Sequence, residues 1–358
     1  MAGENERTGG ASTGDAPTHG GPYSAAAAVD HDLGSTVVAM SYRDDRDPAG
    51  SIAVGIAPDL GSNMFRFRVG ERDLIYTEPD LLRRMDFTGA FVLWPLPNRV
   101  RDKRYTYRGR TYSLADVPRP QGNDALIHGL VFDRPWRHDP PVATAESASV
   151  TTYIDITPES PHYDAYPFAS RLALEYTLTR DGVTIAYSVH NKGAEELPYG
   201  FALHPYFATL AGKGDTLVRI PAREVMEADD ELLPTGRVLP VDGLMYAPFD
   251  LRAPLPVGQL KLDHVYTALQ PGEDAMIDYR AKEGAQGLRL RLSTSDDFTH
   301  MVIYTLGDGP SLCLENQTCS TDAVNLHDQG LQEIAHLLEV PPGGTRGGFI
   351  RYTVERLE

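Results

Sequence analysis

The stretch GFALHPYFATL, residues 200–210, places an ionisable imidazole within a run of apolar and aromatic residues. The alternation predicts a strand with Ala202, His204 and Tyr206 on one face. Pro205 cannot donate a hydrogen bond to a neighbouring strand, so it indicates a strand end, an edge or a bulge. Such irregularities re-aim side chains and often occur beside functional sites. His204 is therefore either a candidate acid–base group or a half-buried structural histidine.

A carboxylate, Glu315, closes the apolar run in SLCLENQ, with Cys313 and Gln317 on the same predicted strand face. Apolar neighbours raise the pKa of a carboxyl group because they disfavour its charged form. A carboxylate with a raised pKa is a usable base near neutral pH. A glutamate that turns into solvent at a strand end would have no such role. Together, His204 and Glu315 are the best acid–base pair that the sequence offers, and such a pair moves protons without a cofactor.

Further polar residues could hold a substrate. The stretch WPLPNRV is stiff and extended, and it presents Arg99 next to Asn98; a guanidinium donates to hydroxyl or carboxylate oxygens. His128 stands before Gly129, which indicates a turn or a close approach of the backbone. Asp263 precedes a predicted strand in KLDHVYTAL. Each also has a structural interpretation, as an ion pair for Arg99, a backbone cap for His128 and a turn residue for Asp263.

Other common catalytic patterns are missing from the sequence. It contains no GxGxxG, P-loop or HExxH motif. The two cysteines, Cys313 and Cys319, are too few for a disulfide framework, and metal ligands do not cluster near them. Neither has an obvious histidine partner, so a thiol nucleophile is not expected. We therefore predict no metal and no cofactor.

The clearest structural unit is RLALEYTLTRDGVTIAYSVHN, residues 171–191. Apolar residues alternate with other residues on both halves of this stretch, at Leu172, Leu174, Tyr176 and Leu178 and then at Val183, Ile185, Tyr187 and Val189. The pattern predicts a β-hairpin with a type I′ turn at Asp181-Gly182.

Short apolar or alternating runs of this kind continue along the chain. Helical periodicity is nearly absent, and only DLLRRM and DQGLQEIAHLL are predicted to form one or two helical turns. Many closely spaced strands without a βαβ rhythm predict an all-β fold, a large antiparallel β-sandwich. We expect residues 34–358 to form this single catalytic domain. Residues 1–33, rich in Gly, Ala, Ser and Thr, are predicted to be a disordered tail, because they bury too little apolar surface to offset their ordering entropy.

Composition restricts the partners. The formal charge is −17 over 358 residues, which argues against nucleic acid, whose phosphates need Lys and Arg contacts. The charge suits a soluble protein that handles a neutral small molecule. No apolar run approaches the roughly 20 residues needed to span a membrane, and the N-terminus does not resemble a signal peptide. We expect a cytoplasmic monomer or homodimer with no nucleic-acid or membrane partner.

Several segments match the motifs of one family in order. WPLPNR resembles its F-P-x-P-N-R segment, IHGLVFDRPW its H-G-x-x-R-x-x-x-W segment, and ELPYGFALHPYF its L-P-x-G-x-x-x-H-P-Y-F segment. Later matches are DDELLPTGRVLPVDG, FDLR, LDHVYTAL and VIYTLGDGPSLCLENQTCSTDAVNL. From about residue 50 to 350, the chain resembles the aldose 1-epimerase, or galactose mutarotase, family. The HPYF and CLENQT segments together carry most of the specificity.

The resemblance implies a β-sandwich of the supersandwich type and an isomerase that interconverts the α and β anomers of a free aldose such as galactose or glucose. His204 would protonate the ring oxygen, and Glu315 would take the proton from the C1 hydroxyl. Sugar hydroxyls would be held by Arg99, His128 and Asp263, with Asn98 supporting Arg99.

The sequence departs from the common pattern in ENQT, in the tryptophan of LWPLPN and in PDLGSNM, which leaves the sugar preference open. One alternative is a hexose 6-phosphate epimerase, favoured if Arg101, Lys103 and Arg104 line the pocket. Another is a non-catalytic carbohydrate-binding protein on the same fold. A third is a glycoside-cleaving enzyme or a lyase, in which Asp263 and Glu315 would form the carboxylate pair.

Overall fold

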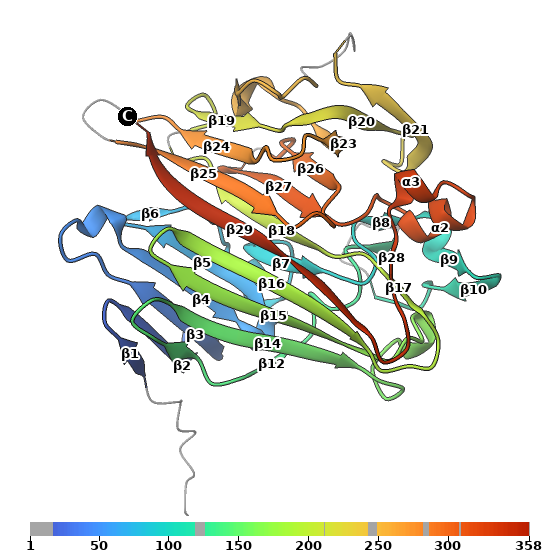
Figure 1. Ribbon diagram of the computed structural model, residues 1–358, viewed down its shortest axis with the longest axis horizontal. Coiled ribbons are helices and arrows are strands. Elements are labelled where there is room, and N and C mark those ends of the chain that lie inside the picture. The colour runs from blue at the N-terminus through green and yellow to red at the C-terminus, as the bar shows by residue number, and fades with distance from the viewer. Residues whose placement is uncertain are drawn as a thin grey trace, which may run out of the picture.

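A computed structural model describes residues 17–118, 126–210, 212–242, 249–281, 286–307 and 309–357. Three large sheets of six, ten and seven strands contain most of the strand residues, and the ladders between their named strands are antiparallel. The predicted large antiparallel β-sandwich is therefore confirmed (Figure 1).

The six-stranded sheet is built in chain order from the N-terminal part of the chain. Its strands are β1 (Thr18–Gly20), β2 (Tyr23–Asp30), β3 (Ser35–Tyr42), β4 (Ile52–Ala57), β5 (Asn63–Val69) and β6 (Arg72–Asp73).

Strand β2 corrects the predicted disordered tail. It pairs with β3 along its whole length, from Tyr23 opposite Tyr42 to Asp30 opposite Ser35. Alternate side chains of β2 are buried, among them Tyr23 and Ala25. Alanine loses no side-chain entropy on burial, so a run that looks featureless by composition folds once β3 supplies its hydrogen bonds. The prediction is wrong for residues 18–30, and residues 1–16 lie outside the described residues.

The ten-stranded sheet crosses the front of the molecule (Figure 1). Its strands are β12 (Arg137–His138), β13 (Val142–Ala143), β14 (Ala148–Ile156), β15 (Ser170–Thr179), β16 (Gly182–Asn191), β19 (Thr216–Arg219), β22 (Leu255–Pro256), β24 (Ala275–Tyr279), β25 (Gly287–Thr294) and β29 (Thr345–Leu357). Their order is β12-β14-β15-β16-β29-β25-β24-β19-β22, and β13 pairs with β14.

The predicted hairpin is confirmed as β15 and β16, but its turn lies one residue earlier than expected. Thr179 pairs with Gly182, so the two-residue loop is Arg180-Asp181. Gly182 has a φ of 142°, and a Cβ there would come 1.9 Å from the carbonyl oxygen of Tyr352 on β29. The glycine serves the close approach of β29 rather than the turn.

The seven-stranded sheet carries the residues that could do chemistry. Its strands are β7 (Ala90–Leu93), β18 (Ala202–Ala208), β20 (Ala222–Ala228), β21 (Pro234–Pro240), β23 (Asp263–Leu269), β26 (His300–Tyr304) and β27 (Ser311–Gln317). Their order is β21-β20-β23-β26-β27-β18-β7. Beyond β7, the segment that follows β6 pairs with β18, through Ile75 opposite Phe207, which joins the six-stranded and seven-stranded sheets.

Small elements complete the fold. The two-stranded sheets are β8 (Arg99–Val100) with β11 (Leu126–Ile127), β9 (Arg104–Tyr107) with β10 (Arg110–Ser113), and β17 (Leu197–Tyr199) with β28 (Leu338–Val340). The helices are α1 (Pro79–Arg83), α2 (Ala323–Asp328) and α3 (Gln332–Ala335), and the 3₁₀ turns are η1 (Pro48–Gly50), η2 (Pro58–Leu60), η3 (Arg101–Lys103), η4 (Tyr163–Ala165) and η5 (Val257–Gln259). The predicted helical turns correspond to α1 and α3, while α2 was not predicted.

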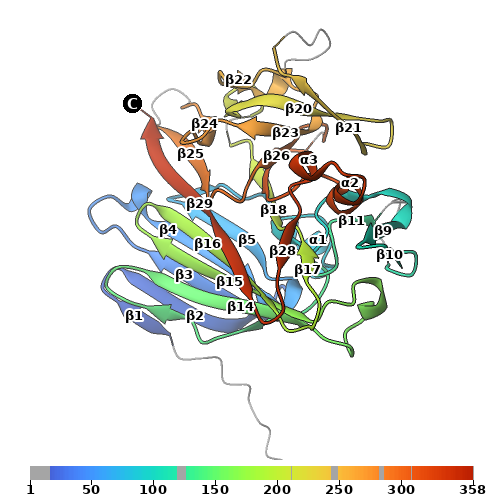
Figure 2. The same cartoon turned by 45° about the vertical axis from the view of Figure 1, so that its right-hand side comes forward.

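The hydrophobic core lies between the ten-stranded sheet in front and the other two large sheets behind it (Figures 1 and 2). Tyr352 of β29 is 1% exposed and links all three sheets. Its ring lies 6.4 Å from the ring of Phe67 on β5 and 5.5 Å from that of Phe207 on β18. This packing supports β18 on the face opposite to that of His204.

Candidate active site

The acid–base pair predicted from the sequence forms a direct contact. His204 lies on β18 and Glu315 on the neighbouring β27, where the register pairs Ala202 with Gln317 and Tyr206 with Cys313. The register sets the imidazole opposite the carboxylate, and His204 Nε2 lies 3.2 Å from Glu315 Oε1. The two side chains are only 8% and 3% exposed. Two polar side chains that apolar strands would normally exclude are therefore buried together.

Pro205 lies inside β18 rather than at a strand end. It is paired with Ala90, the first residue of β7, and beyond this point Ile75 takes the place of β7 beside Phe207. The proline therefore stands where β18 changes its partner, a position that tolerates a residue without an N–H group.

Aromatic rings hold the His204 imidazole in one orientation. The ring of Phe91 stacks on it at 4.7 Å between centroids, and the ring of Tyr206 stacks at 5.1 Å, both tilted by 16°. These rings leave the edge of the imidazole facing Glu315. The alternation that put Tyr206 on the face of His204 predicted one of them, whereas Phe91 comes from a strand distant in sequence.

Burial sets the protonation of the pair. Burial, with a smaller contribution from the charge of Arg99, lowers the pKa of His204 to about 3. Burial also raises the pKa of Glu315 well above its ordinary value, against the opposing effect of Gln317, whose Nε2 donates to Oε2 at 3.2 Å. The pair as a whole therefore retains one proton over a wide pH range. That proton is on the carboxyl when both groups are neutral, or on the imidazole when they form an ion pair.

His128, which directly follows β11, reaches the same place. Its φ is +67°, and that of Gly129 is +79°. A Cβ on Gly129 would come 2.3 Å from the carbonyl oxygen of Trp94, so the predicted close approach of the backbone is confirmed. The imidazole of His128 meets that of His204 edge to face, with centroids 4.9 Å apart. Burial lowers the pKa of His128 well below its ordinary value, and the nearby His204 and Arg99 lower it further.

The remaining predicted residues form the polar side of the site. Arg99 Nη2 lies 3.7 Å from Asp263 Oδ2, and Arg99 Nη1 donates to Asn98 Oδ1 at 3.2 Å. Asp263 is the first residue of β23, two strands away from β27. Burial raises the pKa of Asp263, although Arg99 opposes the change.

A cavity of about 210 Å³ joins all of these groups. Each of the six residues predicted from the sequence lines it. The lining residues are Phe87, Asn98, Arg99, Ile127, His128, His204, Tyr206, Asp263, Val302, Tyr304 and Glu315. Phe87 and Tyr304 were not singled out from the sequence, because they come from a loop and a strand that only the folded sheet brings to the cavity.

The cations that would have favoured a phosphorylated sugar lie elsewhere. Arg101 Nη2 donates to Asp229 at 3.0 Å, and Arg104 Nη2 lies 3.4 Å from Asp102. Arg99 is the one arginine or lysine among the described residues that line the cavity.

Neither cysteine is set up as a nucleophile. Cys313 and Cys319 are both buried thiols. Burial raises the pKa of Cys319 to about 12 and that of Cys313 well above its ordinary value. Within the described ranges, no group of three or more His, Cys, Asp or Glu side chains is arranged to hold a metal ion.

Solved structures share this architecture. A galactose mutarotase-like protein from Clostridium acetobutylicum superimposes with a TM-score of 0.76 at 21% identity, covering 89% of this chain and 96% of that one. Galactose 1-epimerase from Lactobacillus acidophilus gives a TM-score of 0.69 at 18% identity, covering 91% and 96%. The fold is therefore that of the galactose mutarotase-like proteins.

Sequence comparison defines the family. The profile described as aldose 1-epimerase matches residues 54–344, so the chain belongs to the aldose 1-epimerase family. Galactose mutarotase of Mus musculus is 25% identical over 319 residues, 82% of each protein. The uncharacterized protein YihR of Escherichia coli is 32% identical over 146 residues, which span 40% of this chain and 44% of YihR.

In the part of the chain that the structure describes, no helix is long and apolar enough to cross a membrane. The cytoplasmic location and the monomeric or homodimeric state stay predictions.

Proposed function

We propose that this protein is an aldose 1-epimerase that interconverts the α and β anomers of a free aldose. The observation that carries the proposal is the buried contact of 3.2 Å between His204 and Glu315 at a cavity that also presents Arg99 and Asp263. Ring opening of a sugar needs one proton delivered and one removed at oxygens bonded to the same carbon. A buried imidazole and carboxylate that share one proton supply both functions.

The reaction uses the ion-pair form of the two residues. The Glu315 carboxylate takes the proton of the C1 hydroxyl as the C1–O1 bond becomes a carbonyl. The bond between C1 and the ring oxygen breaks, and the ring oxygen takes a proton from His204 Nε2. Rotation about C1–C2 presents the other face of the aldehyde, and closure returns both protons. Each half-reaction leaves one proton on the pair, so no net proton is consumed.

The other lining residues would hold the sugar. Arg99 donates to hydroxyl oxygens and Asp263 accepts from hydroxyl groups, while Asn98 keeps the guanidinium in place through its 3.2 Å contact. The lowered pKa of His128 keeps its imidazole neutral. A neutral imidazole both donates and accepts a hydrogen bond, as a hydroxyl requires.

The charge at the cavity favours a neutral sugar such as galactose or glucose over a hexose 6-phosphate. Arg99, the one arginine or lysine among its described lining residues, already lies 3.7 Å from Asp263. A phosphate would bring two negative charges to a site whose cation is shared with a carboxylate. The same pairing with Arg99 argues against Asp263 as one of the two carboxylates of a glycoside hydrolase.

The test is anomer exchange measured by NMR magnetisation transfer on glucose, galactose, arabinose, xylose and a hexose 6-phosphate. The native protein should accelerate exchange over the uncatalysed rate for at least one neutral sugar. Glu315→Gln and His204→Ala should each lower kcat by about 10²-fold or more, because each removes one partner of the proton transfer.

Glu175→Gln is a matched control, because Glu175 is exposed on β15, and it should keep the native rate. Full activity in either site variant would remove that residue from the mechanism. Binding detected by line broadening, with no accelerated exchange of any sugar, would instead identify a carbohydrate-binding protein.

A further inference from the structure

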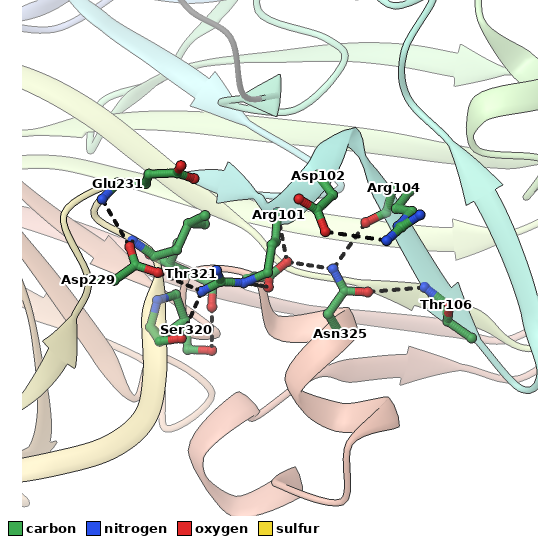
Figure 3. A network of polar contacts seen from close by, with 12 residues as sticks. Arg101, Asp102, Arg104, Thr106, Asp229, Glu231, Ser320, Thr321 and Asn325 are labelled. Carbon is green, nitrogen blue, oxygen red and sulfur yellow. Dashed lines mark hydrogen bonds and ion pairs between the residues drawn. The ribbon is translucent and has the colours of Figure 1, made fainter.

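Two segments that match the family motifs have no part in the proposed proton transfer. One contains Asp229 and Pro234 at the turn between β20 and β21, and the other contains Asp322 and Asn325 after β27. They are far apart in sequence, yet both meet the segment that follows Arg99 (Figure 3).

The segment that carries Arg99 is irregular. β8 has two residues, and the residues on either side adopt left-handed backbone conformations, with φ of 58° at Asn98, 54° at Asp102 and 52° at Lys103. Non-glycine residues hold such conformations only where surrounding contacts fix them. The position of the Arg99 guanidinium therefore depends on what restrains this segment.

Asp322 restrains the backbone directly. Its N–H donates to the carbonyl oxygen of Arg99 at 3.1 Å, and its Oδ1 accepts from the backbone N–H of Arg101 at 3.2 Å. These two hydrogen bonds lie on either side of Val100, and they satisfy the backbone groups of Arg99 and Arg101 as a neighbouring strand would. The Asp322 side chain is 2% exposed, and its second oxygen lies 3.8 Å from Arg101 Nε.

Asn325 extends the restraint to β9. Its Nδ2 donates to Asp322 Oδ1 at 2.7 Å and to the carbonyl oxygen of Arg104 at 3.0 Å. Its Oδ1 accepts from the backbone N–H of Thr106 at 3.1 Å (Figure 3). One amide side chain therefore fixes Asp322 together with a carbonyl and an N–H group of the β9 backbone.

Arg101 ties the same segment to the opposite side of the site. Its Nη2 donates to Asp229 Oδ2 at 3.0 Å and to the carbonyl oxygen of Pro234 at 3.2 Å. Asp229 Oδ1 in turn accepts from the backbone N–H groups of Glu231 and Leu233, each at 3.0 Å. The segment that follows Arg99 is thus held by Asp229, Asp322 and Asn325, which do not line the cavity.

We propose that Asp322 is a positioning residue that, with Asn325 and Arg101, holds the Arg99 segment so that its guanidinium faces the sugar. The inference rests on the proposed function and deepens it, because it assigns a role to the segments of Asp229 and of Asp322–Asn325. Burial raises the pKa of Asp322 to about 6, against the opposing effects of Asn325 and Arg101. The fold therefore keeps this carboxyl buried although its ionised form is disfavoured there.

The test is a double-mutant cycle between Asp322→Ala and Arg99→Lys, measured as kcat/KM for the preferred sugar. Asp322→Ala should lower kcat/KM by about 10- to 100-fold, mainly through KM, because a displaced binding group weakens the hold on the sugar. In the Arg99→Lys background, the same change should cost less than about threefold, because the group to be positioned is already altered. Asp322→Asn keeps an oxygen that accepts from the Arg101 N–H, and it should recover most of the activity.

Asp278→Ala is the matched control. Like Asp322, Asp278 is a poorly exposed aspartate that forms an ion pair with an arginine, and its Oδ1 lies 2.6 Å from Arg289 Nε. It lies, however, on β24 of the ten-stranded sheet. It should lower Tm while leaving kcat/KM within about twofold, and its effect should add to that of Arg99→Lys. Full additivity of Asp322→Ala and Arg99→Lys would overturn the proposal and leave the proposed function intact.

Amide hydrogen exchange gives a readout that does not depend on activity. Asp322→Ala should increase exchange in residues 98–106 in particular, whereas Asp278→Ala should not. If the native protein accelerated anomer exchange of no sugar, the proposed function would fail. The pattern of amide hydrogen exchange, together with sugar affinity, would still decide the role of Asp322. Unchanged protection in residues 98–106 would overturn it. If Asp322→Ala does not fold, Asn325→Ala is the substitute variant. This change removes only the hydrogen bonds that Asn325 makes to Asp322 and to β9.

Discussion

In the proposed reaction, the proton shared by His204 and Glu315 governs the chemistry at the scale of single residues. Burial lowers the pKa of His204 to about 3 and raises that of Glu315. A pair that holds one proton can exist as two neutral groups or as an ion pair, and these differ only in the position of that proton. A bound sugar that comes between the two groups, with its ring oxygen at His204 and its C1 hydroxyl at Glu315, would supply hydrogen bonds that favour the ion pair.

The pH dependence of kcat/KM should therefore be broad. Activity should fall on the acid side as the pair gains a second proton, near the lowered pKa of His204 of about 3. On the alkaline side it should fall as pH rises through the raised pKa of Glu315, where the pair loses its only proton.

Gln317→Leu should move the alkaline limb to higher pH. The Gln317 amide donates to Glu315 and stabilises its charged form, so the pKa of Glu315 rises further when this donor is removed. The pH profile of kcat/KM, measured by magnetisation transfer, checks this shift. A shift to lower pH would mean that the amide does not act on the ionised carboxylate.

At the scale of elements, the site combines regular and irregular strands. β18 and β27 are central strands of a packed sheet, and they set the relation of His204 to Glu315 through their register. β8 and β11 have two residues each, and they present Arg99 and His128 from chain segments held by tertiary contacts. In the proposed mechanism, the proton-transfer pair therefore lies on paired strands of the large sheet, whereas Arg99 and His128 come from segments added to that sheet.

The N-terminal strands contribute stability rather than chemistry. Deletion of residues 1–33 removes β2 and the burial of Tyr23, which is 5% exposed. Burial of one large side chain stabilises a fold by about 1.5–3 kcal/mol, and the unpaired edge of β3 adds to the loss. We expect a Tm lower by roughly 4 °C or more, measured by differential scanning calorimetry.

Deletion of residues 1–16 alone is the matched control and should leave Tm unchanged, because it keeps β1 and β2 in place. An unchanged Tm after the longer deletion would show that β2 adds little to the stability of the sandwich.

At the scale of the whole molecule, the acidic balance acts on charged ligands before they reach the cavity. A net charge of −17 produces a negative field that repels anions and leaves neutral sugars unaffected. Salt screens such a field, with a Debye length of about 10 Å at 0.1 M. We therefore expect the net charge to disfavour anionic sugars, in addition to the effect of the pairing of Arg99 with Asp263.

Ionic strength should separate the two classes of sugar. For a neutral aldose, kcat/KM should stay constant between about 10 mM and 300 mM NaCl, since no long-range attraction is involved. For a hexose 6-phosphate it should be lower and should rise with salt as repulsion is screened. Faster turnover of the phosphosugar at low salt would instead indicate a cationic approach to the cavity and would favour the hexose 6-phosphate epimerase.

The sequence by itself determined the fold class and the set of six residues at the cavity. Strand alternation is a local property, so the hairpin of β15 and β16 and the face shared by His204 and Tyr206 could be predicted from neighbouring residues. The motif resemblance supplied the residues that alternation alone left ambiguous, such as Asp263.

Only the tertiary structure decided which residues support these six. The ring of Phe91 on His204, the place of β2 in a sheet and the bonds from Asp322 to the Arg99 segment all join residues distant in the chain. Such pairings leave no periodic signal in the sequence. The pKa of Glu315 was likewise fixed by complete burial, which depends on the whole sandwich closing over the carboxylate rather than on its neighbours in the chain.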